Sequence, residues 1–114
     1  KPKFLYPFFS QDVAKSVNAC LVELPQADGR RFITAKQLSK SQTARKVQKA
    51  FADNFASQCG YCTPGFISGV TSCSTSDQRE LELNGHICRC TGYFPIKNAV
   101  KDSPIVDIEE LAQL

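Results

Sequence analysis

Two short cysteine motifs, QCGYCTPG and HICRCTGY, constrain this 114-residue chain more than any other feature. The first places Cys59 and Cys62 three positions apart, and the second places Cys88 and Cys90 two positions apart. Each pair is followed at once by a Thr and then by a Pro or Gly, which is typical of a helix start. Four thiolates delivered in this way can bind one inorganic centre, and that centre would cross-link the helices.

The six cysteines of the chain leave three kinds of site open. A disulfide scaffold needs a secreted context, and the first residues, with two prolines and no small-residue cleavage site, argue against a signal peptide. We therefore expect a cytoplasmic protein whose thiols bind metal. Tetrahedral zinc and an iron–sulfur cluster both accept four thiolates. A Rieske-type cluster would need two histidines, and His86 is the only one in the sequence.

The part of the chain that carries the motifs has a helical pattern. Apolar residues recur at three- and four-residue steps over residues 41–56, which predicts an amphipathic helix. Further helices are predicted over residues 64–72, over residues 75–83 and from about Gly92 onward. The sequence therefore predicts a C-terminal four-helix bundle with a cysteine pair at the start of two of its helices.

The first third of the chain has a different pattern. Residues 19–24 and 30–34 have the composition of two short strands, and the segment between them contains a Pro and an Asp-Gly pair typical of turns. Two strands alone are marginally stable, so they would need a partner. The predicted fold class is α+β, with a β segment over residues 1–38 and a helical domain with a C-terminal tail over residues 39–114.

Composition argues against two classes of partner. The 14 Lys and Arg residues and the 11 Asp and Glu residues give a net charge of +3, and they are interspersed along the chain. A nucleic-acid-binding protein would be expected to gather its basic residues on one face. No stretch approaches the roughly 18 consecutive apolar residues of a membrane span. We expect neither a nucleic acid nor a membrane as partner.

Together with their flanking residues, the two motifs resemble those of one protein family. QCGYCTPG followed by GHICRCTGY resembles the helical [2Fe–2S] domain of the xanthine oxidase family of molybdenum hydroxylases, over about residues 41–101. His86 stands where that family commonly has Asn, but this difference removes no ligand. The resemblance implies that Gln58 and Cys90 lie close to the pterin of a molybdenum centre. It also implies that four cysteines ligate a [2Fe–2S] cluster: Cys59, Cys62, Cys88 and Cys90.

The resemblance extends to the segment around Cys20. Residues 16–21 are similar to the segment that bears the fourth ligand of a plant-type ferredoxin domain, which precedes the helical domain in this family. The other ligands of that domain come from an upstream C-x4-C-x2-C run, and residues 1–19 contain no cysteine. We therefore expect residues 1–38 to be the remnant of a ferredoxin β domain. Cys20 is either a ligand of a second cluster or a small buried hydrophobic residue.

In this family a molybdenum–pterin centre hydroxylates the substrate, and electrons then pass through the iron–sulfur clusters and usually FAD. The resemblance therefore implies an electron-transfer subunit with no catalytic residue of its own. Its partners would be a molybdopterin-binding large subunit and an FAD-binding subunit. The alternative is an interaction module that zinc stabilises through the four motif cysteines and that has no redox role. Cys73 has no partner in either motif, and we expect it to be structural.

Overall fold

The computed structural model describes residues 15–105, 110–111 and 114 of the chain. The helices in these ranges are η1 (a 3-10 helix, Ala19–Leu21), α1 (Leu24–Ala27), α2 (Ala35–Leu38), α3 (Gln42–Asp53), α4 (Thr63–Ser72), α5 (Ser76–Leu83) and α6 (Phe94–Asp102). The last four helices confirm the four predicted from apolar periodicity and capping residues. Among the described residues, no helix is long and apolar enough to cross a membrane.

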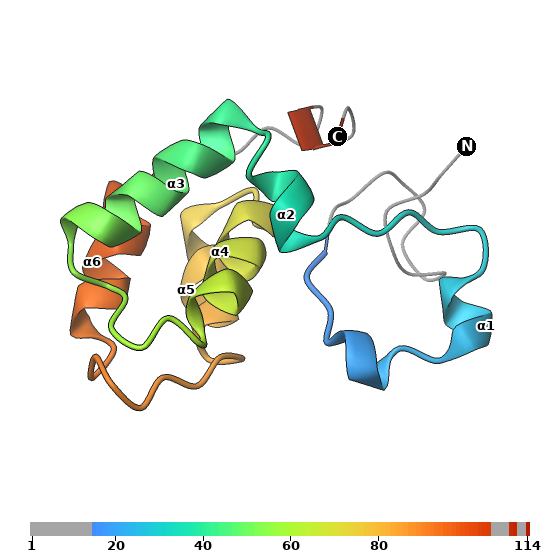
Figure 1. Cartoon of the computed structure of the whole chain (residues 1–114), viewed down its shortest axis with the longest axis horizontal. Helices are drawn as coiled ribbons and strands as arrows, with labels where there is room; N and C mark the ends of the chain where they lie inside the picture. Colours follow the sequence, from blue (N-terminus) through green and yellow to red (C-terminus); the bar gives the residue numbers. More distant parts are fainter. Residues whose placement is uncertain (1–14, 106–109, 112–113) are drawn as a thin grey trace.

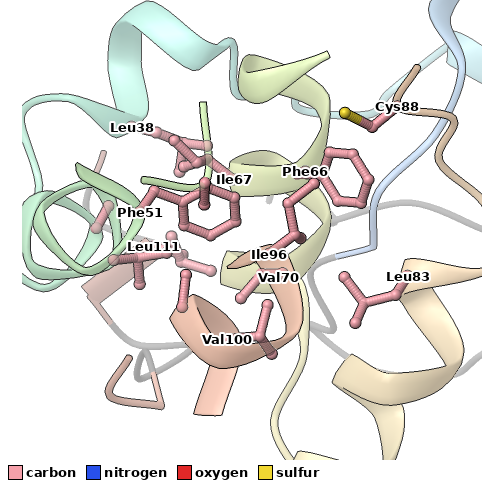
Figure 2. Close-up of a cluster of buried hydrophobic side chains, with 14 residues drawn as sticks. Leu38, Phe51, Phe66, Ile67, Val70, Leu83, Cys88, Ile96, Val100 and Leu111 are labelled. Atoms are coloured by element: carbon pink, nitrogen blue, oxygen red, sulfur yellow. The ribbon is translucent and has the colours of Figure 1, made fainter. Parts of the chain in front are cut away.

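Helices α3 to α6 lie around one hydrophobic core (Figure 1). Helix α3 contacts α4 and α6, helix α5 contacts α4 and α6, and the short α2 packs on α4. Each helix contributes apolar side chains from one face, as an amphipathic pattern requires. The largest members of this core are Leu38, Phe51, Phe66, Ile67, Val70, Leu83, Ile96, Val100 and Leu111 (Figure 2).

Helix α3 has well-defined signals at both ends. Its N-cap is Ser41, whose side-chain oxygen accepts a hydrogen bond from the Ala44 N–H at 3.2 Å. At its C-terminus, the Ala56 N–H bonds the Phe51 carbonyl at 2.9 Å, and the Phe55 N–H bonds a carbonyl one turn back. These two hydrogen bonds together form a Schellman motif. The motif requires one residue in the left-handed backbone conformation, and that residue is usually Gly. Here Phe55 takes that conformation, with φ +54°.

The buried Arg79 ties helix α5 to the end of α6. Its side chain is 2% exposed, and its Nη1 donates to the Ser103 carbonyl at 2.9 Å and to the Ser103 hydroxyl at 3.1 Å. Its Nη2 donates to the Pro104 carbonyl at 2.6 Å. Burial lowers the pKa of Arg79. The guanidinium therefore satisfies carbonyls that the end of α6 leaves without a helical partner.

The C-terminal segment returns to the start of α3. The carboxylate of Glu110 accepts hydrogen bonds from the hydroxyls of Ser41 and Thr43, the latter at 2.5 Å, and from the Thr43 N–H at 3.3 Å. These bonds, with the hydroxyl of Ser41 first, lower the pKa of Glu110. The adjacent Leu111 is buried in the core. A negative side chain is thus placed at the positive end of the α3 dipole.

The predicted strands are wrong for the residues that the structure describes. Residues 19–24 contain η1 and the start of α1, and no strand occurs between residues 15 and 105. The local reason is that Glu23 and Gln26 form a capping box around Pro25, which starts a helical turn. Two strands without a neighbouring sheet would also gain little from pairing. The described ranges contain helices joined by irregular segments, with one isolated bridge residue at Arg30, and residues 1–14 of the predicted β segment lie outside them.

Candidate metal centre

The four motif cysteines lie in two loops, each of which leads into a helix. Cys59 and Cys62 lie in the loop between α3 and α4, and Cys62 is the N-cap residue of α4. Cys88 and Cys90 lie in the loop between α5 and α6. Figure 1 shows both loops at the same end of the helical region. The shared core thus brings together two motifs that are more than twenty residues apart in sequence.

Electrostatic interactions group the four thiols in two pairs, each with one cysteine from either loop. The thiol of Cys62 interacts with that of Cys88, and the thiol of Cys90 interacts with that of Cys59. Weaker charge interactions join Cys62 to Cys59 and Cys90 to Cys88. Among the described residues, no three His, Cys, Asp or Glu side chains are grouped around a single point that could hold one metal ion. The donor set consists of sulfur, which suits iron–sulfur clusters and zinc.

The site has an inner side and an outer side. Cys88 is 7% exposed and belongs to the hydrophobic core, at whose edge Figure 2 shows it beyond Phe66. Cys62 is half-buried, whereas Cys59 and Cys90 are exposed. A bound centre would therefore be fixed by the core through two cysteines and would reach the surface through the other two.

Thr91 supplies the strongest electrostatic effect in the site. Its hydroxyl oxygen lies 3.0 Å from the Cys88 sulfur, and its N–H donates to that sulfur at 3.5 Å. These two contacts lower the pKa of Cys88 to about 7. Cys88 therefore presents a thiolate near neutral pH, and the thiolate is the form that binds metal.

The pKa values of two other thiols are shifted in the opposite direction. Burial and the neighbouring Cys88 raise the pKa of Cys62 to about 11. The interaction with Cys59 raises the pKa of Cys90. A thiolate opposes the ionisation of a thiol beside it, and a metal centre that binds both as thiolates removes this opposition.

The Thr residues that follow the cysteine pairs do not cap the helices. The N-cap residues are Cys62 for α4 and Tyr93 for α6. Thr63 is the first residue of α4, and its hydroxyl lies 2.8 Å from that of Ser57. The two Thr residues therefore have different roles, because only Thr91 contacts a sulfur.

A glycine makes the sharp turn beside each cysteine pair. Gly60 has φ +81° and Gly92 has φ +72°, a region that disfavours residues with a Cβ atom. Gly60 lies between the two cysteines of the first loop, and Gly92 follows the second pair after one residue. The glycines of the motifs thus let the loops turn at the thiols.

His86 lies in the second loop and contacts α4. Its ring stacks on Phe66 with centroids 4.8 Å apart, and its Nε2 lies 3.1 Å from Glu82 Oε1. A Cβ atom on Gly69 of α4 would come within 2.7 Å of His86 and 2.6 Å of Glu82. The glycine therefore makes room for this pair, and His86 is a half-buried packing residue.

Three further residues singled out in the sequence are not members of the sulfur pairs. Gln58 is exposed and directly precedes Cys59. Cys20 is exposed in η1, so the prediction that it is a small buried residue is wrong. Cys73 is buried, donates to the Gly69 carbonyl at 3.3 Å and has its pKa raised by burial, as a structural thiol would.

Sequence reasoning gave Tyr93 no role of its own, although it belongs to the second motif. Its phenol oxygen accepts a hydrogen bond from the Cys88 N–H at 2.9 Å and donates to the His86 carbonyl at 3.4 Å. The motif does contain this tyrosine, but the letters alone do not show that its side chain turns back to the loop.

Comparison with known proteins identifies the family. The sequence profile of the [2Fe-2S] binding domain family matches residues 34–101. The chain is 35% identical over 98 residues to a xanthine dehydrogenase of Emericella nidulans, covering 79% of this chain and 7% of that protein. It is 39% identical over 95 residues to the small subunit of nicotine 6-hydroxylase of Paenarthrobacter nicotinovorans, covering 78% of this chain and 57% of that subunit.

A further relative is the abscisic-aldehyde oxidase of Arabidopsis thaliana, which is 35% identical over 108 residues. That match covers 83% of this chain and 8% of the relative. The chain thus spans little more than half of the small subunit and less than a tenth of the two larger relatives. By its profile match and its relatives, the chain belongs to the [2Fe–2S] binding domain family and represents the iron–sulfur domain of the xanthine oxidase family.

Proposed function

We propose that Cys59, Cys62, Cys88 and Cys90 ligate one [2Fe–2S] cluster through which the chain passes single electrons. The observations that carry this proposal are the position of both cysteine loops at one end of the helical region (Figure 1) and the electrostatic interactions that join their thiols in two cross-loop pairs. A [2Fe–2S] cluster takes four thiolates, and the two pairs supply four from one end of the fold. When bound, the cluster supplies one-electron redox chemistry, and the protein supplies its position and electrostatic environment.

The chain's own residues would set the reduction potential of the cluster. Two irons, two sulfides and four thiolates carry a net charge of 2− when oxidised and 3− when reduced. Donors that point at the sulfurs stabilise the more negative form and raise the reduction potential. Thr91 provides two such donors at Cys88.

We further propose that the chain is the electron-transfer component of a molybdenum hydroxylase complex. The relatives named xanthine dehydrogenase and nicotine 6-hydroxylase small subunit support this proposal. A molybdopterin-binding large subunit would supply electrons, and an FAD-binding subunit would receive them. Cys90 and Gln58 are both exposed and would face the molybdopterin side. No residue of this chain would be catalytic.

The decisive experiment is metal and sulfide analysis of anaerobically purified protein. We expect two irons and two acid-labile sulfides per chain, and a red-brown colour that fades with dithionite. Cys62→Ser should abolish the cluster, whereas the matched control Cys73→Ser should keep it, because Cys73 lies outside both loops. Unchanged iron in Cys62→Ser would rule out the ligand assignment.

The same analysis tests the remaining predictions about metal. A zinc-stabilised module would be colourless and would contain zinc without labile sulfide. Cys20 as a ligand of a second cluster stays a prediction, as does the division at residues 38 and 39. We expect one cluster for this chain alone, and four irons per chain would contradict that.

A further inference from the structure

The phenol of Tyr93 spans the loop that carries Cys88. Tyr93 belongs to the start of α6, yet its oxygen accepts from the Cys88 N–H at 2.9 Å and donates to the His86 carbonyl at 3.4 Å. One side-chain oxygen thus joins the backbone on both sides of Ile87. The contact fixes the backbone directly at a proposed cluster ligand.

The rest of the structure holds this phenol in place. Tyr93 has φ +70°, which an aromatic residue adopts only when its surroundings impose it. Its N–H donates to the Thr91 hydroxyl at 3.3 Å. Its ring packs edge-on against Phe66 with centroids 6.4 Å apart, and Phe66 is fully buried. The strained backbone and the core contact together direct the oxygen toward the loop.

The hydrogen bond decides where one backbone donor points. The Cys88 sulfur already receives two donors from Thr91. The Cys88 N–H instead donates to the neutral hydroxyl oxygen of Tyr93. An N–H directed at a cluster sulfur would stabilise the reduced state and raise the reduction potential.

We propose that Tyr93 is a positioning residue for the cluster, whose hydroxyl holds the Cys88 backbone and keeps its N–H away from the cluster sulfurs. This inference rests on the proposed function. With the phenol oxygen of Tyr93 in place, the cluster would have a lower reduction potential than it would have in the same loop without that oxygen.

The test is Tyr93→Phe in the full chain, compared with Tyr61→Phe. Phe keeps the ring that packs on Phe66 and removes only the oxygen. Tyr61 is the matched control because it lies between Cys59 and Cys62, yet its side chain is 94% exposed, so water can replace its contacts. We expect both variants to keep two irons and two sulfides. The midpoint potential of Tyr93→Phe should be more positive than that of wild type, with an altered EPR signal of the reduced cluster, and Tyr61→Phe should match wild type.

The outcomes separate this inference from the function on which it rests. A loaded Tyr93→Phe protein with wild-type potential and EPR signal would overturn the role of Tyr93 alone, whereas wild type without iron and sulfide would overturn both. If Tyr93→Phe loses iron, 4-aminophenylalanine at this position restores a polar group on the same ring. Recovery of iron in that variant would support the inference, and failure to recover it would reject it.

Discussion

The hydroxyl oxygen of Thr91 lies 3.0 Å from the sulfur of Cys88, and the Thr91 N–H also donates to that sulfur. The equivalent residue of the first motif, Thr63, instead places its hydroxyl 2.8 Å from that of Ser57. The two motifs look alike in sequence, but only the Thr of the second motif is hydrogen-bonded to a cysteine sulfur. This asymmetry provides a variant and a matched control within one chain.

Thr91→Val should lower the midpoint potential of the cluster by about 60 mV. The variant removes an O–H donor that stabilises the reduced cluster more than the oxidised one. A difference of about 1.4 kcal/mol between the two states, which is a tenfold change in the equilibrium, corresponds to about 60 mV for one electron. Redox titration of the loaded protein measures the shift. Thr63→Val should leave the potential unchanged, and equal shifts in both variants would argue against a specific bond to Cys88.

Phe55→Gly should stabilise the protein by about 1 kcal/mol, because Gly adopts the left-handed C-cap conformation without strain. Little packing is lost, since the Phe55 side chain is 81% exposed. Urea unfolding of the loaded protein measures the difference. Phe55→Ala is the control, because it removes the same ring and keeps the strained Cβ. Equal stability of the Gly and Ala variants would contradict this explanation.

Arg79→Met should destabilise the fold by about 3 kcal/mol, because Met fills the buried space but leaves the carbonyls of Ser103 and Pro104 without their donor. The shift in urea midpoint measures this loss. The control is Arg45→Met, since Arg45 is exposed and bonds one carbonyl, that of Ser39, at 2.6 Å. A comparable loss in both variants would show that burial of Arg79 is not the cause.

Glu110 should make the attachment of the C-terminal segment depend on pH. Its pKa is lowered in the folded protein from the usual 4.5, so its contribution is complete above that value and is lost as the pH falls through the folded pKa. Short-pulse hydrogen exchange should show that protection of the first turn of α3 declines below pH 4.5 in wild type. Glu110→Gln should show no such decline, and the exposed Glu80→Gln should behave as wild type. A decline that persists in Glu110→Gln would reject the assignment.

The sequence was sufficient to locate four helices and the cysteine motifs. Periodic apolar residues placed α3, and Thr75 followed by Gln78 placed the start of α5, because both signals are local. The predicted strands failed because residues 19–24 have strand-like composition, while Glu23 and Gln26 close a helical turn. A local capping interaction decided that outcome, and composition alone does not reveal it.

The arrangement within the site was not readable from the sequence. The motifs identify the four cysteines, but the pairing of Cys62 with Cys88 and of Cys59 with Cys90 depends on how the helices pack. The role of Tyr93 likewise depends on a backbone angle of +70° that is unusual for its residue type. Such features arise from contacts distant in sequence, which periodicity does not report.

The contact between Cys59 and Cys90 also has a consequence for the protein before it receives its cofactor. Both thiols are exposed, lie in different loops and interact electrostatically. An oxidant that removes two electrons can join such thiols as a disulfide, and that bond would close the site to iron. If the proposed ligands are correct, iron can enter this site only while both thiols are reduced.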